Sequence, residues 1–453
     1  MLDYLIINGK YPDYEAGELK EGNIGIKDGK IASIDAEMHP AAQIIDAAGK
    51  VVSPGFIDIH MHEEWFESEG EQYIVANYML GQGVTTCVGG NCGLMHQPAK
   101  VFKETINKLG GSPVNYMLLS GYNYYRTQLG YGHYEPTKPE DCEKIYERIR
   151  EDVAEGVCGI SFGLEYDPGI TYEDMVNAAK EVEGDELMIA IHYRADRSKG
   201  LGNLQELIDL QETTNKKVQF SHLGSCMALG KTKGALDMMN EYMEKNPRFN
   251  FDTYPYDAFS SRIGSAVFDG NCLEKWGKEY ENIMMTGEPY KNVRCTKEIF
   301  EDCRENYPDM YAVAFVMDSE GISAAVANPK GMIASDGILK DGNGHPRAAG
   351  TFPRVFSKFV REDKVISLMD AMRKVTLEPA KRLMIDDRKG QIKEGYDADI
   401  TIFDPETIQD GPDFSDITIK SKGIDYVFIK GQIAAKDCDI VNGRLGVFIP
   451  YNQ

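Results

Sequence analysis

The 453-residue chain is predicted to be an α/β protein, with a (β/α)8 TIM-like barrel and a small β-sandwich built from both chain termini. Three observations support this fold. Short apolar runs alternate with longer amphipathic segments through the middle of the chain, both ends carry turn-rich alternating runs, and histidine, cysteine and aspartate follow several apolar runs. A barrel of this kind is expected to carry its functional site at the carboxyl ends of the strands.

Both ends of the chain have the sequence pattern of short β-strands joined by tight turns. Alternating apolar residues bounded by Gly, Asp or Asn predict hairpins in LDYLIING, NIGIKDGKIASID and AQIIDAAGKVVSPG near the start, and the same pattern returns in GYDADITIFDPETI, DYVFIKGQIAA and GRLGVFIPY near the end. We therefore expect residues 1–52 and 385–453 to form one accessory β-sandwich domain. Residues 53–384 are expected to form the barrel.

Apolar runs in the middle region are predicted to be the barrel strands. They are Pro54–His60, Val84–Gly89, Pro113–Ser120, Cys158–Phe162, Leu187–His192, Lys217–His222, Phe249–Thr253 and Gly331–Asp336. The gap between the last two is longer than one helix with its loops requires. We therefore expect an insertion around residues 257–330 that covers the active site, and its segment KEIFEDCRENYPDM is predicted to be helical.

Composition and charge argue against several classes of function. A formal net charge of −23, without a basic stripe interleaved with aromatic residues, disfavours a nucleic-acid partner. No uninterrupted apolar run is long enough for a membrane span. The start of the chain lacks a secretion signal, and nine cysteines without a framework spacing favour a reducing compartment, so the predicted location is cytoplasmic. The oligomeric state is not predicted.

Four of the eight histidines follow apolar runs. His60 and His62 are two residues apart, so an extended backbone would aim both imidazoles to one side, and His192 and His222 end two further runs. Any one of them alone is more often a hydrogen-bonded structural residue than a ligand. Because the carboxyl ends of barrel strands meet at one face, the four together predict a metal site.

Cys92 and Asp336 complete the predicted site. A thiolate is a good zinc ligand beside imidazole, and Cys92 lies in a glycine-bounded loop, whereas Cys87 is interpreted as a core residue. Asp336 ends the eighth run, where by itself it better fits the cap of an Asp-Gly turn. Beside a metal that lowers the pKa of water from about 16 to about 7, it can act as general base and then general acid.

The collinear order of these motifs resembles the D-aminoacylase branch of the amidohydrolase superfamily, the N-acyl-D-amino-acid deacylases. The motifs are GFIDIHMH, GGNCG, GISFGLEYDPG, IHYR, SHL, DTYPY, SDG with HPRAAGTFPR, and GQIKEGYDADITIFDP. The resemblance covers nearly the whole chain. His-x-His and GYDADI are general to the superfamily, while NCG, GLxYxPG and HPRxxGTF are much narrower.

The resemblance implies a zinc-dependent hydrolase that cleaves N-acyl-D-amino acids into a carboxylate and a D-amino acid. It implies that one zinc ion is held tightly by Cys92, His192 and His222, and that His60 and His62 serve a second, weaker position. Asp336 would be the catalytic acid/base.

The resemblance also implies a set of residues that face the substrate. They are Tyr166, Tyr254, Ser260 and Arg347. In the mechanism that we expect, Tyr254 and His345 are further candidate donors to the developing oxyanion. The planar guanidinium of Arg347 suits a bidentate grip on the substrate α-carboxylate.

One departure from the family pattern concerns carboxylate recognition. Gly224 stands where relatives often carry a lysine that helps to hold the substrate carboxylate, and Arg347, Arg194 and Arg262 are candidates to replace it. Because of this departure, a second functional hypothesis stays open, the hydrolysis of a cyclic amide or imide. Such a substrate does not need a residue that binds an α-carboxylate. A third reading, from another class, is an inactive barrel that serves as a scaffold.

Milder departures surround the candidate ligands. Asp196 replaces a family glutamate after the first ligand histidine, and Glu63 and Glu64 stand where aspartates are common. Together with Gly224, these departures bear on the identity of the substrate more than on the type of reaction.

Overall fold

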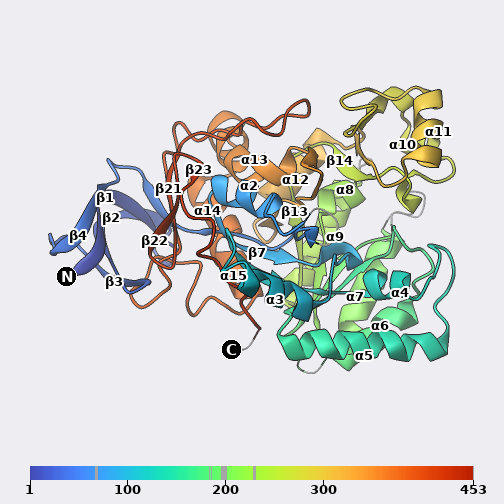
Figure 1. The fold of residues 1–453 in the computed structure, drawn as a ribbon, viewed down its shortest axis with the longest axis horizontal. Coiled ribbons are helices and arrows are strands. Elements are labelled where there is room, and N and C mark those ends of the chain that lie inside the picture. The colour runs from blue at the N-terminus through green and yellow to red at the C-terminus, as the bar shows by residue number, and fades with distance from the viewer. Residues whose placement is uncertain (67–69, 183, 185, 195–200, 228–230, 452–453) are drawn as a thin grey trace.

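The computed structural model describes the chain except for residues 67–69, 183, 185, 195–200, 228–230 and 452–453 (Figure 1). Asp196 therefore lies outside the described residues. A large mixed sheet occupies one end of the molecule, and parallel strands surrounded by helices make up much of the rest.

The sheet at the end of the molecule joins both chain termini. Its strands are β1 (Leu2–Asp13), β2 (Glu18–Lys27), β3 (Lys30–Asp35), β4 (Ala41–Asp46), β5 (Val51–Pro54), β20 (Ile400–Phe403), β21 (Ile424–Ile429), β22 (Gln432–Lys436) and β23 (Asp439–Ile440). The order is β23-β22-β21-β20-β5-β1-β2-β3, and β4 pairs with β1. The hairpin predicted in NIGIKDGKIASID is confirmed, and Asp28 and Gly29, with φ of 49° and 79°, make the tight turn between β2 and β3. The hairpin predicted in AQIIDAAGKVVSPG is wrong, because β4 and β5 each pair in parallel with β1 rather than with each other.

Every predicted barrel run contains a strand. The strands are β6 (Phe56–Asp58), β7 (Val84–Gly89), β8 (Asn115–Leu118), β9 (Ser120–Gly121), β10 (Gly159–Gly163), β11 (Met188–His192), β12 (Lys217–Phe220), β13 (Phe249–Thr253) and β17 (Met332–Ile333). Three strands, β6, β12 and β17, end earlier than predicted, before His60, His222 and Asp336. At His222 and Asp336 the backbone has φ of 36° and 49°, which an extended strand cannot contain.

The parallel strands pair in two sheets that approach each other at both edges. The orders are β6-β7-β8 and β9-β10-β11-β12-β13-β17, and only Leu119 separates β8 from β9. Beyond β17, the N–H of Asp336 donates to the carbonyl of His60 at 2.8 Å, and the N–H of His62 donates to that of Gly337 at 2.9 Å. These bonds place the segment after β17 beside the segment after β6.

Helices connect and cover the parallel strands. They are α2 (Val75–Gly81), α3 (Ala99–Lys108), α4 (Tyr122–Gln128), α5 (Pro139–Glu155), α6 (Tyr172–Glu181), α7 (Gly202–Thr214), α8 (Leu223–Cys226), α9 (Thr232–Lys245), α13 (Arg347–Arg354), α14 (Leu368–Val375) and α15 (Leu377–Arg382). Local signals set their ends. Pro139 begins α5 and Gly156 ends it in a left-handed conformation, while Thr171 and Asp174 form a capping box at the start of α6.

The segment between β13 and β17 contains a small antiparallel sheet with its own helices, at the upper right of Figure 1. Its elements are β14 (Phe259–Arg262), α10 (Cys272–Trp276), β15 (Ile283–Met285), α11 (Lys297–Asn306), β16 (Tyr311–Ala314) and α12 (Ser319–Ala327). The helix predicted in KEIFEDCRENYPDM is confirmed as α11. A short hairpin of β18 (Leu339–Lys340) and β19 (Asn343–Gly344) follows β17.

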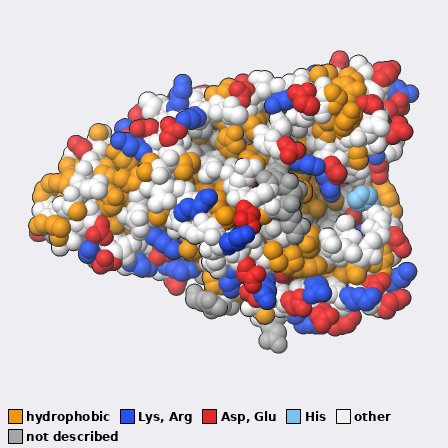
Figure 2. Space-filling model, in the orientation of Figure 1, with side chains coloured by type: hydrophobic (Ala, Val, Ile, Leu, Met, Phe, Trp, Pro, Cys, Tyr) orange, Lys and Arg blue, Asp and Glu red, His pale blue; other side chains and the backbone are white. Residues whose placement is uncertain are grey.

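The surface carries mixed charge. On the face shown in Figure 2, Lys and Arg side chains are interspersed with Asp and Glu rather than gathered into one stripe. Among the described residues, no helix has both the length and the apolar character that crossing a membrane requires. All nine cysteines are free.

Candidate active site

The six predicted ligand and acid/base side chains converge in two overlapping groups. One group contains His60, His62, Cys92 and Asp336, and the other contains Cys92, His192 and His222. Within each group, one potential ligand atom from every residue lies within 4.8 Å of the others. The Sγ atom of Cys92 is 3.3 Å from Nε2 of His60 and 3.4 Å from Nε2 of His222, so this thiol joins the two groups.

Three of these residues have strained backbone conformations. Cys92, His222 and Asp336 have φ of 57°, 36° and 49°, in the left-handed region that non-glycine residues seldom adopt. Each such residue costs about 1–3 kcal/mol and persists only when its surroundings impose it. The backbone of Gly163 packs closely against Cys92, because an added Cβ at Gly163 would lie 2.2 Å from the carbonyl oxygen of Cys92. This close packing helps to hold Cys92 in its conformation.

Two buried glutamates accept hydrogen bonds from the backbone around the site. Glu63 accepts hydrogen bonds from the N–H groups of Gly90 at 2.6 Å and His96 at 2.8 Å, which flank the Cys92 loop. Glu64 accepts from the N–H of Ala76 at 2.8 Å, at the start of α2. These residues appeared in the sequence only as departures from a family pattern, and their contacts show a structural reason for the carboxylates.

Asp252, at the end of β13, is a functional candidate that sequence reasoning did not single out. Its carboxylate accepts from the backbone N–H of His222 and from Nε2 of Gln219, both at 2.9 Å, and lies 3.2 Å from Nδ1 of His60. A carboxylate beside one imidazole nitrogen favours a ring orientation in which the other nitrogen faces the metal position. Here it turns Nε2 of His60 toward Cys92. In the sequence, the one feature that could have identified Asp252 is that it is the single acidic residue in the strand-like run FNFDT.

Replacing Asp252 with asparagine is expected to lower zinc affinity by about 10- to 100-fold, the range typical of lost carboxylate support behind a ligand histidine. Competition with a chelating dye would measure the affinity, with circular dichroism to confirm folding. Asp237→Asn, at an exposed position of α9, makes the same chemical change away from the site. Equal zinc affinity in Asp252→Asn and wild type would contradict the assigned positioning role.

Electrostatics favour anionic forms of the central sulfur and carboxylate. Burial raises the pKa of Asp336, but the Arg347 guanidinium and the imidazoles of His222, His60 and His62 outweigh it and hold that pKa well below its ordinary value. Burial likewise raises the pKa of Cys92, and the surrounding imidazoles lower it well below the usual thiol range.

This donor set fits a zinc ion. Zinc prefers thiolate, imidazole and carboxylate ligands, which are the groups that converge here. Within the described part of the chain, the buried Nδ1 atoms of His62 and His192 have no hydrogen-bond partner. Such uncompensated buried nitrogens are uncommon unless a further group binds nearby.

A pocket above the ligand cluster contains most of the predicted substrate-facing residues. Its described lining comprises Glu165, Tyr166, His192, His222, Ser225, Tyr254, Phe259, Ser260, Ser261, Val267, Asp336 and Arg347. Arg347 lies with Nη1 2.9 Å from Oδ2 of Asp336 and its guanidinium carbon 4.7 Å from the Tyr254 ring centre. The Oγ atom of Ser260 and the Nε atom of Arg347 have no partner among the described residues, so both remain available to a ligand.

His345 is buried beside Arg347. Its Nδ1 accepts from the backbone N–H of Arg347 at 3.0 Å, and its Nε2 lies 3.1 Å from the carbonyl of Ala258, to which it donates. Burial and the nearby Arg347 charge hold its pKa well below the ordinary value, so the ring is neutral. His345 does not line the described pocket. Both ring nitrogens therefore contact the backbone, one of them at Arg347, and the predicted substrate contact of His345 stays a prediction.

The other candidate replacements for the family lysine are engaged elsewhere. Arg194 pairs with Glu206 at 3.2 Å, and Arg262 lies 3.5 Å from Asp309. Neither lines the described pocket, which leaves Arg347 as its single guanidinium.

The space beside Gly224 is closed by Ile322, by Met317 and by the hydroxyl of Thr253, whose Oγ1 would lie 3.2 Å from an added Cβ. A Cβ added there would lie 2.3 Å from Cδ1 of Ile322 and 3.5 Å from Cε of Met317. A longer side chain at this position would therefore require these neighbours to move. Among these described neighbours of Gly224, none carries a positive charge that could replace the family lysine.

Comparison with known proteins places this chain in a family. The model of the amidohydrolase family matches residues 51–434. An N-acyl-D-aspartate deacylase of Alcaligenes xylosoxydans xylosoxydans is 25% identical over 461 residues, which cover 95% of this chain and 91% of the relative. The resemblance inferred from the motifs is thereby confirmed.

Solved structures of related proteins match this fold over nearly the whole chain. A D-aminoacylase crystal structure matches with a TM-score of 0.86 at 25% identity, covering 99% of this chain and 100% of that chain. An N-acyl-D-glutamate deacylase from Bordetella bronchiseptica, complexed with zinc and a phosphonate mimic of the tetrahedral intermediate, matches with a TM-score of 0.87 at 23% identity, covering 99% of each chain. The chain belongs to the amidohydrolase family.

Proposed function

We propose that this protein is a zinc-dependent amide hydrolase that converts N-acyl-D-amino acids into a carboxylate and a D-amino acid. The observation that carries the proposal is the convergence of Cys92, four histidines and Asp336 beneath a pocket that holds one guanidinium. The activities named for the aspartate deacylase and the D-aminoacylase relatives support the same reaction.

The proposed architecture is an eight-stranded parallel barrel with a terminal β-sandwich. Counting β8 and β9 as one strand, the bonds between the segments after β17 and after β6 support closure. Strands from both termini share one sheet, which supports an accessory domain of residues 1–52 and 385–453 beside a barrel of residues 53–384. The small sheet within residues 257–330 supports an insertion, and its residues Phe259 and Ser260 line the pocket.

Cys92, His192 and His222 would hold one zinc ion, and His60 and His62 would serve a second, weaker position. A bound zinc ion supplies Lewis acidity, which polarises the substrate carbonyl and acidifies water. The thiol shared by both groups supports two neighbouring positions.

Asp336 is proposed to move the proton. Its Oδ1 atom lies 3.2 Å from Nε2 of His62 and 3.4 Å from Nε2 of His60, while Oδ2 is held by Arg347. The carboxylate is ionised, so it can accept a proton from the attacking water and donate it to the amide nitrogen as the tetrahedral intermediate collapses. The Nε–H of Arg347 and the hydroxyl of Ser260 are available to bind the substrate carboxylate.

The charge of the pocket supports a substrate with a neutral side chain. An N-acyl aspartate or glutamate carries two carboxylates, whereas the described lining offers one guanidinium, which pairs with Asp336, and the carboxylate of Glu165, which lies 3.0 Å from Nε2 of His192. A second substrate carboxylate would face like charge at close range, which costs several kcal/mol. Phe259 and Val267 supply apolar lining instead.

We expect N-acetyl-D-leucine or N-acetyl-D-methionine to be hydrolysed with kcat/KM at least about tenfold above that of N-acetyl-D-aspartate, since a few kcal/mol correspond to factors of ten or more. Steady-state rates of zinc-loaded protein would be measured, with L-enantiomers and a hydantoin included. Glu165→Gln should narrow the gap, and Glu173→Gln, at an exposed position of α6, should leave it unchanged. Preference for acidic substrates would refute the side-chain proposal, and faster hydantoin hydrolysis would favour a cyclic-amide hydrolase instead.

A further inference from the structure

A second cavity lies at the opposite ends of the strands that carry the site. It encloses about 570 Å³, within the range of small-molecule pockets. Its lining includes Lys217 and Phe249, the first residues of β12 and β13, and Lys330, which precedes β17. The extended path from Lys217 to His222 spans about 16 Å. The cavity is therefore separate from the candidate active site.

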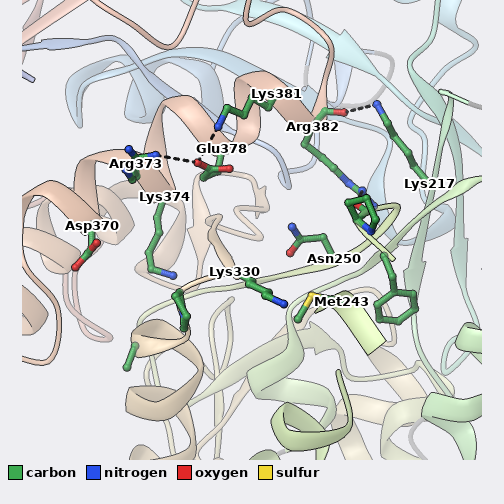
Figure 3. A pocket seen from close by; sticks show the side chains of 14 residues that line it. Lys217, Met243, Asn250, Lys330, Asp370, Arg373, Lys374, Glu378, Lys381 and Arg382 are labelled. Carbon is green, nitrogen blue, oxygen red and sulfur yellow. Dashed lines mark hydrogen bonds and ion pairs between the residues drawn. The ribbon is translucent and has the colours of Figure 1, made fainter. Parts of the chain in front are cut away.

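The lining of this cavity is strongly cationic (Figure 3). Its basic residues are Lys217, Lys330, Arg373, Lys374, Lys381 and Arg382. Only two carboxylates accompany them, Asp370 and Glu378. The whole chain carries a net charge of −23, so this concentration of positive charge runs against its general composition. A concave surface lined by one sign of charge concentrates ligands of the opposite sign.

The available carboxylates are already engaged. Glu378 lies 3.5 Å from Nη1 of Arg373 and 3.3 Å from Nζ of Lys381. Outside the cavity lining, Glu186 pairs with Lys217 at 2.8 Å. Asp370 accepts a hydrogen bond from the hydroxyl of Ser367 at 2.7 Å. These pairs leave Lys330, Lys374 and Arg382 without a carboxylate partner among the described residues.

Two of these three cations are buried. Lys374 donates to the carbonyl oxygens of Gly331, at 2.7 Å, and Asn328, and burial lowers its pKa to about 8. Arg382 donates to the carbonyl of Val218 at 2.6 Å, and burial lowers its pKa to about 9. Charged side chains are seldom buried without a counter-charge. Carbonyl oxygens satisfy their hydrogen bonds but do not neutralise their charge.

We propose that this cavity binds a small molecule through its phosphate or carboxylate groups. Figure 3 shows Lys330, Lys374 and Asn250 in the lining of the cavity, so an anion bound there would be surrounded by ammonium and amide groups. An anion there supplies the counter-charge that the described protein groups lack.

Lys330 is the residue that tests this proposal with least damage to the fold. Its ammonium group has no carboxylate partner in the described part of the chain, and its side chain is half-buried. Lys374 and Arg382 are less suitable because both hold backbone carbonyls. Arg382 also donates from Nε to Gln219 at 3.1 Å, and Gln219 donates to Asp252 behind the ligand His60.

Calorimetric titration of the full-length protein with inorganic phosphate and with citrate, at constant ionic strength, tests the proposal. We expect saturable binding of at least one probe, weakened by about tenfold or more in Lys330→Met, since a hydrogen bond to a charged group contributes about 1.5–3 kcal/mol. The matched control is Lys100→Met, at an exposed lysine of α3 outside the cavity, which should bind as wild type does. The tighter of the two probes identifies the preferred head group.

Thermal unfolding provides a second readout, because a ligand that binds only the folded state raises Tm. The preferred probe should raise Tm of the wild type and of Lys100→Met more than that of Lys330→Met. Absence of saturable binding by both probes would overturn the proposal. Binding that Lys330→Met leaves unchanged would also overturn it, since the anion would then occupy another site.

Discussion

Replacement of Asp336 by asparagine is expected to lower kcat by about 10²–10⁴-fold, the contribution typical of a positioned general acid/base, while zinc remains bound. Asparagine keeps the shape of the side chain but cannot take up and return a proton. The neighbouring ligands Cys92, His192 and His222 form their own group, which does not include Asp336. Loss of turnover with retained metal is therefore the expected pattern.

The measurement combines metal content by elemental analysis with steady-state kinetics on the best N-acetyl-D-amino acid. Asp237→Asn again serves as the matched control, because it removes the same charge from an exposed position of α9. Near-normal turnover in Asp336→Asn would exclude Asp336 as the proton carrier. Loss of zinc from this variant would instead assign Asp336 a ligand role, which its 3.2 Å contact with His62 permits.

The sequence was sufficient to predict the strands and the residues that follow them. Apolar runs recur with strand-like length, and the chemistry-bearing side chains stand directly after them, as with His192 and His222. Parallel strands bring such positions together from distant parts of the chain, so local pattern and topology suffice to group them. The exact ends of the strands were less predictable, because the left-handed backbone at Asp336 is imposed by its partner segment around His60.

Residues that act through long-range contacts could not be identified in this way. Asp252 orients His60 across nearly two hundred positions of sequence, and nothing local in FNFDT distinguishes it from any buried acid. His345 and Arg347 belong to one short motif, yet only Arg347 lines the pocket, because both ring nitrogens of His345 bond to backbone. Side-chain direction within a turn depends on the surrounding structure, which motif spacing does not encode.

Cys92→Ala is expected to remove metal from both candidate positions and to reduce activity to background. The Sγ atom of Cys92 belongs to both donor groups, so its loss weakens both at once. The fall in zinc affinity should exceed the about 10- to 100-fold loss typical of an outer partner such as Asp252. His62→Ala touches one group alone, so it should retain one zinc ion per chain and measurable turnover.

Cys87→Ala is the control for this comparison. It makes the same substitution at a buried cysteine of β7 that belongs to neither group and whose pKa burial raises well above the ordinary value, so it remains a neutral thiol. Zinc per chain after exhaustive dialysis and turnover would be measured for all three variants. If Cys92→Ala kept its full zinc content, the shared-ligand arrangement would be wrong. If Cys87→Ala lost zinc equally, cavity formation rather than coordination would explain the loss, because truncating any buried side chain disturbs the surrounding packing.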